Sequence, residues 1–376
     1  MRIAVVGVGG SGSAACMYLA REGHDVVGYE QFQIGHDKGS SHGESRIIRY
    51  AYADPLFTIL MKESFLLWKQ LEIESGENLM ERCGCLLFGD PNNAMARETE
   101  RTLRKTGVGC ERLSSLETNI RFPAFHLEEN QIALFMEEGG LLRPKKCVLA
   151  HVRLAREYGA DIRERSMARN IRQSGEKVIV ETELGEEKYD KAIITAGPWM
   201  ADLLSEAPLP LIVTRQQVVY LAISRNQDQF SPVRMPVWID ADTLLYGFPS
   251  DGIIEGVKLA DHHLGETVDP NSVQKEIDMP YIQRITNYTA SRFPDLSAKV
   301  THAQVCLYTN TVSEDFILDS PPGADRIIIV SGCSGHGFKF TTLLGKLAYE
   351  RACGLPERYD LSRFALHRFI ASGSEC

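Results

Sequence analysis

The chain has 376 residues, of which 44% are hydrophobic, so it can bury a sizeable core and its length suggests two domains. Lys and Arg total 41 and Asp and Glu total 50, which gives a formal net charge of −9; with no block of basic residues to neutralise phosphates, this argues against a nucleic-acid partner. The nine cysteines follow neither CxxC spacing nor metal-ligand intervals with histidine, which favours a reducing compartment and argues against a metal site.

The start of the chain predicts a strand, a glycine turn, a helix and a second strand. An apolar run from Arg2 to Val6 precedes GVGGSG, and a helical pattern then leads to a strand that ends at Glu30. Gly7, Gly9 and Gly12 let the backbone approach a pyrophosphate at the amino end of the helix. Glu30 is placed to accept hydrogen bonds from ribose hydroxyls and would repel a 2′-phosphate. The pattern predicts a dinucleotide site and leaves FAD and NAD undivided.

A polar, glycine-rich segment follows from Gly35 to Tyr52, where a plain nicotinamide domain would continue with another apolar strand. Arg46 and Arg49 lie one helical turn apart in it. Such a segment would suit a loop that wraps a cofactor. Its composition alone favours a solvated surface loop, so both interpretations stay open.

Two later segments repeat the order of strand, glycine turn and helix. The first strand runs from Tyr189 to Ala196 and ends at Gly197; the second runs from Arg326 to Val330 and leads into a helix from Phe340 to Cys353. The regions between these segments read as alternating strands with long loops.

The expected fold is therefore α/β with α+β insertions, in which a Rossmann-like dinucleotide domain is interleaved with a mixed-sheet substrate domain. We expect the dinucleotide domain to comprise residues 1–80, 141–206 and 318–376. The substrate domain is expected to comprise residues 81–140 and 207–317.

Six motifs follow one another along nearly the whole chain. They are GVGGSG at Gly7, GSSHGESRIIRYAY at Gly39, ITAGPW at Ile194, YGFPS at Tyr246 with KLADHH at Lys258, CLYTNTVSEDFILD at Cys306 and SGHGFKF at Ser334. Together they resemble the sarcosine oxidase family of flavoenzymes, which includes monomeric sarcosine oxidase, N-methyltryptophan oxidase and L-pipecolate oxidase. The resemblance implies FAD as cofactor and hydride transfer from the carbon beside a secondary amine to flavin N5, which yields an imine; O2 then reoxidises the flavin and forms H2O2.

The resemblance also implies roles for individual residues. Cys306 is the expected point of covalent attachment, through a thioether to the flavin 8α-methyl group. Arg49 and Lys339 are expected to bind the substrate carboxylate, as an arginine fork and a lysine point charge. Lys258 is expected near flavin N5, where an ammonium promotes the reaction with oxygen.

The implied catalytic set comprises Lys258, Arg46, Tyr246, His262 and Tyr308. Tyr246, His262 and Tyr308 match positions that line the substrate pocket, whereas Arg46 and His42 match positions beside the flavin ring. The remaining expected cofactor contacts are Gly7, Gly9, Gly12, Glu30, Ser41, Ser45, Gly197, Cys306, Gly335, Gly337, Phe338 and Lys339. Cys333 departs from the apolar residue that is usual before SGHGF; of two interpretations, a second thiol near the flavin or a packing residue, we favour packing.

The leading interpretation is an FAD-dependent oxidase of secondary amino acids such as sarcosine or L-pipecolate. A larger N-methyl or glycated amino acid is an alternative substrate. From other classes, the alternatives are an NAD-dependent dehydrogenase, which the Cys306 motif argues against, and a flavin-binding protein without turnover, which Lys258, Arg49 and Lys339 argue against.

We expect a monomer in the cytoplasm that uses an amino acid and O2 and has no nucleic-acid, membrane or metal partner. Glycines within the uncharged stretch from Ile3 to Ala20 argue against a signal peptide. The terminal Ser-Glu-Cys differs from the peroxisomal tripeptide of some relatives.

Overall fold

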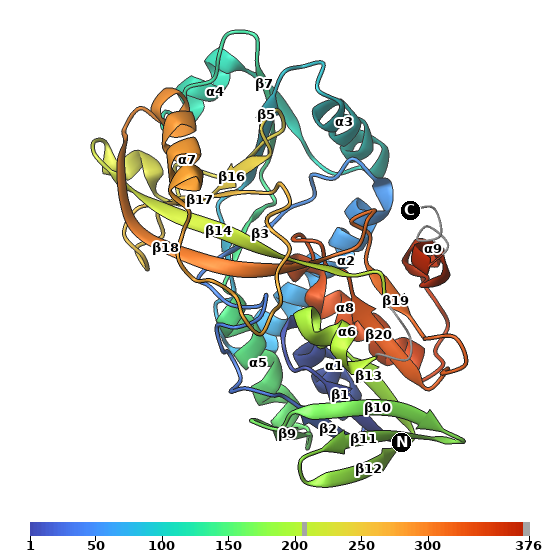
Figure 1. The fold of residues 1–376 in the computed structure, drawn as a ribbon. Helices are drawn as coiled ribbons and strands as arrows, with labels where there is room; N and C mark the ends of the chain where they lie inside the picture. Colours follow the sequence, from blue (N-terminus) through green and yellow to red (C-terminus); the bar gives the residue numbers. More distant parts are fainter. Residues whose placement is uncertain (205–208, 371–376) are drawn as a thin grey trace.

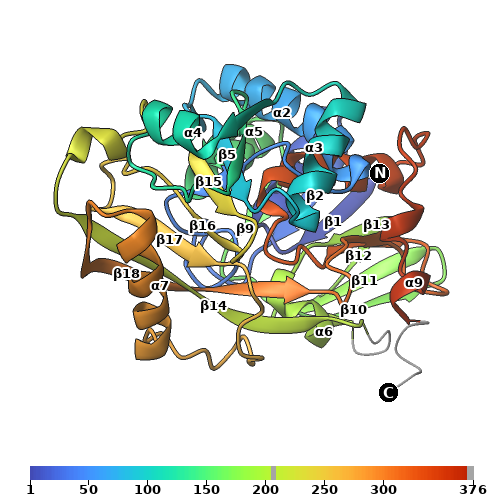
Figure 2. The ribbon, with the colours of Figure 1, turned by 90° about the horizontal axis from the view of Figure 1, so that it is seen from above.

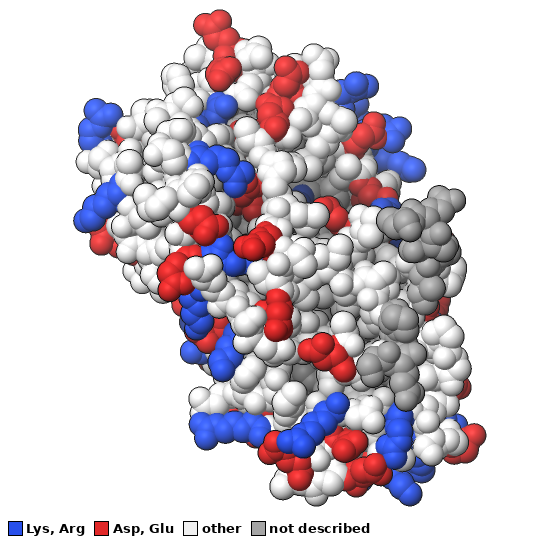
Figure 3. Space-filling view, in the orientation of Figure 1, with Lys and Arg blue, Asp and Glu red and all other residues white. Residues whose placement is uncertain are grey.

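The computed structural model describes residues 1–204 and 209–370 (Figure 1). The expected domain boundary at residues 206–207 and the terminal Ser-Glu-Cys lie outside the described residues. Within them, no helix is both long enough and apolar enough to cross a membrane. Charged side chains of both signs are interspersed over the face in Figure 3.

A six-stranded sheet forms the lower half of Figure 1, in the order β19-β20-β13-β1-β2-β9. Its strands are β1 (Arg2–Val6), β2 (Asp25–Tyr29), β9 (Asp161–Arg163), β13 (Lys191–Ile194), β19 (Ile317–Asp319) and β20 (Ile327–Ser331). All pairs are parallel except β19 with β20. The strands are almost continuously apolar and buried, as parallel strands covered by helices are. The interleaved α/β fold expected from the sequence is thereby confirmed.

Three helices pack together against this sheet: α1 (Gly10–Arg21), α5 (Pro144–Glu157) and α8 (Thr341–Ala352). Gly345 of α8 lies so close to α1 that an added Cβ would fall 2.5 Å from the Cβ of Ala14. An antiparallel meander of β10 (Ala168–Ser174), β11 (Lys177–Thr182) and β12 (Gly185–Tyr189) precedes β13. Tyr189 therefore ends the meander and does not begin the next strand as predicted, because the turn at Asp190 separates β12 from β13.

An eight-stranded mixed sheet forms the upper half, in the order β18-β14-β17-β16-β15-β5-β7-β6. Its strands are β5 (Cys85–Gly89), β6 (Glu111–Ser114), β7 (Ile132–Met136), β14 (Ile212–Ile223), β15 (Val237–Asp240), β16 (Leu245–Gly247), β17 (Val257–Asp261) and β18 (Leu296–Asn310). Helices α3 (Ala94–Thr106), α4 (Ser115–Arg121) and α7 (Met279–Arg292) lie around it. The long paired strands β14 and β18 run from this sheet toward the six-stranded one (Figure 2).

A small sheet has the strand order β3-β8-β4. Strand β3 (Arg46–Ile48) precedes helix α2 (Pro55–Ser75) in the chain, and β4 (Met80–Arg82) and β8 (Gly140–Leu142) follow it. Arg46 begins β3 and Arg49 follows its end, so their spacing is that of extended backbone and not of a helical turn. Side chains three residues apart along an extended segment point to opposite sides. The two arginines are thus directed to different places.

Candidate functional site

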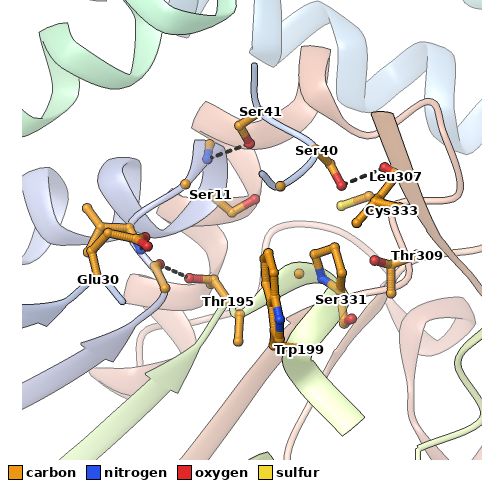
Figure 4. Close-up of a pocket in the computed structure, with 18 of the residues that line it drawn as sticks. Ser11, Glu30, Ser40, Ser41, Thr195, Trp199, Leu307, Thr309, Ser331 and Cys333 are labelled. Atoms are coloured by element: carbon orange, nitrogen blue, oxygen red, sulfur yellow. Dashed lines mark hydrogen bonds between the residues drawn. The ribbon is translucent and has the colours of Figure 1, made fainter. Parts of the chain in front are cut away.

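A cavity of about 250 Å³ opens at the carboxyl ends of β1, β2, β13 and β20 and reaches β18 (Figure 4). Of the expected site residues, those that line it are Gly7, Gly9, Glu30, Ser41, Arg46, Gly197, Cys306, Tyr308, Gly335, Gly337 and Phe338. Those that lie outside its wall are Gly12, His42, Ser45, Arg49, Tyr246, Lys258, His262 and Lys339. One cavity therefore joins the glycine turn to the thiol of Cys306.

The glycine turn has the backbone that a close approach requires. Gly7 has a φ of +88°, and an added Cβ would fall 2.6 Å from the carbonyl oxygen of Thr195. A Cβ on Gly12 would fall 1.9 Å from the carbonyl oxygen of Gly7, so Gly12 serves strand–helix packing behind the cavity wall. At the start of α1, the Gly10 N–H donates to the Ser41 hydroxyl at 3.0 Å.

Glu30 presents a fixed carboxylate at the end of β2. One oxygen accepts from the Val8 N–H and the other from the Phe32 N–H, both at 3.0 Å. The side chain is buried and lines the cavity, and each carboxylate oxygen can accept more than one hydrogen bond. Glu30 therefore presents a buried carboxylate with spare acceptor capacity to the cavity.

The glycine-rich segment after β2 forms the wall of the cavity and is not a solvated surface loop. Ser40 donates from its hydroxyl to the Leu307 carbonyl at 2.7 Å, and Ser41 faces the start of α1 (Figure 4). His42 and Ser45 are buried. The segment thus ties α1 to β18 across the cavity, as a cofactor-wrapping loop would.

Two buried hydroxyl groups in the cavity wall have no hydrogen-bond partner among the described residues: Thr309 Oγ1 of β18 and Ser331 Oγ of β20. Such groups cost free energy unless a ligand or water satisfies them. The cavity therefore fits a long, polar ligand such as a flavin dinucleotide. We did not predict Thr309, Ser331 or Trp199 from the sequence, although Thr309 and Trp199 lie within the CLYTNT and ITAGPW motifs.

Cys306 lies on β18 opposite Gln216 of β14, and its side chain is only 8% exposed. Burial raises the pKa of this thiol, whereas Arg46 and Lys258 lower it and so favour the thiolate. Cys333 packs against the hydrophobic core, as expected, and it also lines the same cavity. The backbone on either side of Cys333 has positive φ, +64° at Gly332 and +43° at Ser334. The sequence predicted a glycine turn here but did not predict a positive φ at a serine.

Arg46 and His42 lie beside one another near this thiol. Arg46 donates to the carbonyl oxygens of Ser45 at 2.9 Å and Ser40 at 3.1 Å. The amide nitrogen of Gln304 donates to His42 Nδ1 at 2.8 Å. Burial, followed by the charge of Arg46, lowers the pKa of His42 to about 3, so the imidazole is neutral near pH 7.

Lys258 lies on β17 with its side chain only 3% exposed. Its ammonium donates to the carbonyl oxygen of Ser45 at 2.8 Å and to the Ser45 hydroxyl at 3.2 Å. Nζ also lies 4.5 Å from the centre of the Phe248 ring. Burial, with a contribution from Arg46, lowers the pKa of Lys258 well below its usual value.

Tyr246, His262 and Tyr308, the three side chains that were predicted to line a substrate pocket, lie close together. The hydroxyls of Tyr246 and Tyr308 are 3.2 Å apart, and the His262 ring lies 5.9 Å from that of Tyr308. Burial, followed by the charges of Arg49 and Lys339, lowers the pKa of His262 to about 4. Gly335, with a φ of +72°, leaves room for the Tyr308 ring, because an added Cβ would fall 2.1 Å from its Cε2 atom.

Arg49 and Lys339 lie on the same side of this group. The guanidinium carbon of Arg49 is 4.4 Å from the centre of the Tyr52 ring, and Lys339 Nζ donates to the Tyr52 hydroxyl at 3.0 Å. Lys339 is 5% exposed, and burial followed by the charge of Arg49 lowers its pKa well below the usual value. Neither cation forms an ion pair with a carboxylate of residues 1–204 or 209–370.

The Rossmann-like sheet, the glycine turn and the acid after β2 define a dinucleotide-binding oxidoreductase. The family model described as FAD dependent oxidoreductase matches residues 2–351. The chain belongs to this family, which confirms FAD as the cofactor and the predicted resemblance.

The chain is also similar to curated relatives over almost its full length. The chain is 34% identical over 373 residues to peroxisomal sarcosine oxidase of Mus musculus, covering 97% of this chain and 95% of the relative. It is 31% identical over 374 residues to monomeric sarcosine oxidase of Bacillus sp. (strain B-0618), covering 97% and 95%. N-methyl-L-tryptophan oxidase of Yersinia pestis (strain Pestoides F) is 30% identical over 372 residues, covering 97% and 98%.

Solved structures share the fold at lower identity. L-proline dehydrogenase from P. horikoshii superposes with a TM-score of 0.86 at 20% identity, over 99% of this chain and 98% of that one. NikD, an amino acid oxidase of nikkomycin biosynthesis, gives 0.85 at 22% identity, over 97% and 96%.

Proposed function

We propose that this protein is an FAD-dependent oxidase of secondary amino acids such as sarcosine or L-pipecolate, with O2 as the electron acceptor. One observation carries the proposal. Arg49 and Lys339 are two cations without an anionic partner among the described residues, close to His262 and to Tyr308, which itself lines the cofactor cavity. A buried positive pair of this kind requires an anion, and an amino acid carboxylate supplies one.

The residues that would hold FAD follow from the cavity wall. Gly7 and Gly9 would allow the pyrophosphate to approach α1, Glu30 would accept from the ribose, and Cys306 would form the thioether. Of the other expected contacts, Ser41, Arg46, Gly197, Gly335, Gly337 and Phe338 line the cavity, whereas Gly12, His42, Ser45 and Lys339 lie outside its wall. When bound, FAD supplies the hydride acceptor and the route for electrons to oxygen.

The charges around the substrate would keep its amine neutral, which the removal of hydride from the neighbouring carbon requires. Arg49 and Lys339 would disfavour a second positive charge on the substrate while they hold its carboxylate. The low pKa of His262 leaves its imidazole neutral near pH 7. The Tyr246 and Tyr308 hydroxyls would orient the amine by hydrogen bonds.

Lys258 would assist the reaction with oxygen. Its ammonium is buried and held by Ser45, and it lies close enough to Cys306 to favour the thiolate by lowering the pKa of that thiol. A positive charge in a dry site stabilises negative charge that develops on oxygen more strongly than it does in water. Under this proposal, O2 is reduced to H2O2 near the thiol of Cys306.

We also propose the domain division at residues 1–80, 141–206 and 318–376 for FAD and 81–140 and 207–317 for the substrate. It is supported by the two large sheets, whose described strands fall largely on either side of these boundaries. A cytoplasmic monomer completes the proposal, by analogy with the relative named monomeric sarcosine oxidase.

A panel of amines scored by H2O2 release tests the function. It should contain sarcosine, L-pipecolate, N-methyltryptophan, a glycated amino acid and the corresponding primary amino acids. We expect peroxide from a secondary amino acid, with loss of visible flavin absorbance when oxygen is excluded. Colourless protein that reduces NAD would overturn the proposal, and activity with only the larger amines would assign the alternative substrates.

A further inference from the structure

Tyr52 lies between the two cations of the proposed carboxylate site, although we predicted no role for it from the sequence. Arg49 Cζ is 4.4 Å from the centre of its ring, and Lys339 Nζ is 5.5 Å from the same point. The Lys339 ammonium also donates to the Tyr52 hydroxyl at 3.0 Å. A single aromatic side chain therefore contacts both cations, one through its π face and one through its oxygen.

A directed chain of hydrogen bonds continues from Tyr52. His336 Nε2 lies 3.0 Å from the Glu314 carbonyl oxygen, which only accepts, so Nε2 carries the proton. Burial lowers the pKa of His336 well below its usual value, so Nδ1 is unprotonated. The Tyr52 hydroxyl, 3.2 Å away, consequently donates to Nδ1, and its oxygen is free to accept from Lys339. Each hydrogen bond in this series therefore has a defined donor and a defined acceptor.

Aromatic packing holds both members of this chain in place. The Tyr52 ring stacks on Phe57 with centroids 5.3 Å apart, and the His336 ring stacks on Phe316 with centroids 4.8 Å apart. Trp68 fixes the backbone, because its indole N–H donates to the Lys339 carbonyl at 2.8 Å. The chain is therefore rigid from Glu314 to Lys339.

We propose that Tyr52 and His336 are positioning residues that hold Arg49 and Lys339 as a preset pair of cations for the substrate carboxylate. Lys339 spends two of its three ammonium protons on Tyr52 and on the His336 carbonyl, which lies 2.7 Å from Nζ. One donor remains for a ligand. Stacking on Tyr52 leaves the N–H edge of the Arg49 guanidinium available for a bidentate contact.

This inference rests on the proposed function. It adds a reason why the flexible side chains of Arg49 and Lys339 would bind a carboxylate tightly. A free lysine loses several rotatable bonds when it grips a ligand, and a preset one has already lost them. The structure thus assigns the specificity for a carboxylate to a four-residue unit: Arg49, Tyr52, His336 and Lys339.

The test measures binding of acetate and of acetamide, its neutral counterpart, to the oxidised flavin-loaded enzyme by the change in the visible spectrum. Tyr52→Phe keeps the ring under Arg49 and removes only the hydroxyl. We expect the acetate Kd to rise by about tenfold, the size of effect that loss of one hydrogen bond to a charged group produces, and the acetamide Kd to stay unchanged. Flavin content and thermal midpoint should match those of the unaltered enzyme.

Tyr18→Phe is the matched control. Tyr18 is buried, its hydroxyl is 3.2 Å from Thr342 Oγ1, and Arg21 lies 5.2 Å from its ring centre. The variant loses a comparable hydroxyl, and among the described residues the Tyr18 side chain contacts neither Lys339 nor Arg49. We expect its acetate Kd to be unaltered.

A second pair of variants tests His336. His336→Asn keeps an acceptor near the position of Nδ1, whereas His336→Leu removes it. With the best substrate of the panel, we expect the leucine variant to raise KM by about tenfold with a much smaller change in kcat, and the asparagine variant to restore most of the affinity. A role in packing alone would not separate Leu from Asn in this way.

The outcomes distinguish the inference from the function beneath it. If the unaltered enzyme binds acetate no better than acetamide, the carboxylate site is wrong and the inference falls with it. If the enzyme discriminates but Tyr52→Phe retains the acetate affinity, or Tyr18→Phe loses as much, the positioning role is overturned and the proposed function stands.

Discussion

Lys258 Nζ lies 2.8 Å from the carbonyl oxygen of Ser45, which joins β17 of the eight-stranded sheet to the residue before β3. The two residues are 213 positions apart in the chain. This contact directs the buried amino group of Lys258 toward Cys306, and the charge of Lys258 acts to lower the pKa of that thiol. Its structural consequence is an amino group held near the proposed thioether.

Replacing Lys258 by Met should slow the reaction of the reduced enzyme with oxygen by about 100-fold or more, because the charge that stabilises reduced oxygen is lost. Reduction of the enzyme by substrate should change much less. Stopped-flow measurement of the two half-reactions separates them. Lys346→Met, which breaks only the partly exposed pair with Glu63, serves as the control. Unchanged oxygen reactivity would remove Lys258 from this role.

Cys306→Ala should abolish covalent flavin, because it removes the only cavity-lining cysteine that the resemblance assigns to the thioether. After acid precipitation, the unaltered protein should keep its yellow absorbance and the variant should release it into the supernatant. Cys333→Ala removes the second thiol of the cavity wall and should leave the flavin attached. Release from Cys333→Ala in place of Cys306→Ala would reassign the attachment site.

Arg49→Ala should raise KM for an amino acid substrate by about 100-fold, since a bidentate charged contact is lost and Lys339 remains alone. Arg49→Lys keeps the charge but loses the planar fork, so an intermediate KM is expected. Steady-state kinetics with peroxide detection measure both. An unaltered KM in the alanine variant would exclude Arg49 from carboxylate binding.

Gly335→Ala should displace the Tyr308 ring and lower activity, because the added Cβ would fall 2.1 Å from Cε2. Gly323→Ala is a matched control: its φ of +76° is close to the +72° of Gly335, and nothing lies within 4 Å of its added Cβ. Both variants should lose about 1 kcal/mol for the positive φ, measured by denaturant unfolding. Only Gly335→Ala should lose activity and a further increment of stability.

His151 should make unfolding depend on pH. It is fully buried on α5, and burial, followed by the charge of Arg21, lowers its pKa to about 3. Between that value and the ordinary one near 6.5, the unfolded chain binds the proton and the folded chain does not, so stability falls as pH falls.

Relative to His151→Leu, the unaltered protein should therefore lose about 2 kcal/mol of unfolding free energy between pH 7 and pH 5. Urea unfolding at both pH values measures the difference. His367→Leu, which alters an exposed histidine on α9 (His367–Ile370), should leave the pH dependence as it is. Identical pH slopes for His151→Leu and the unaltered protein would contradict the prediction.

The sequence by itself determined the parts of the site that are contiguous in the chain. The turn from Gly7 to Gly12 and the acid at Glu30 are local, because glycine backbone freedom and strand periodicity act over a few residues. The same holds for strands β1, β2 and β20 and for helix α8. The ends of all four elements lie within one residue of the prediction, which is the usual uncertainty of such boundaries. The α/β class followed from these segments, whereas the family resemblance rested on six short motifs along nearly the whole chain.

Only the tertiary structure decided what the distant segments do to one another. It turned the segment around Arg46 into a strand, directed Arg49 away from Arg46, and brought Cys333 into the cavity wall. It also placed Lys339 on Tyr52, 287 residues earlier in the chain. The physical reason is that such contacts arise from pairing and packing between remote elements, and the local preferences of the chain do not encode their register or depth of burial.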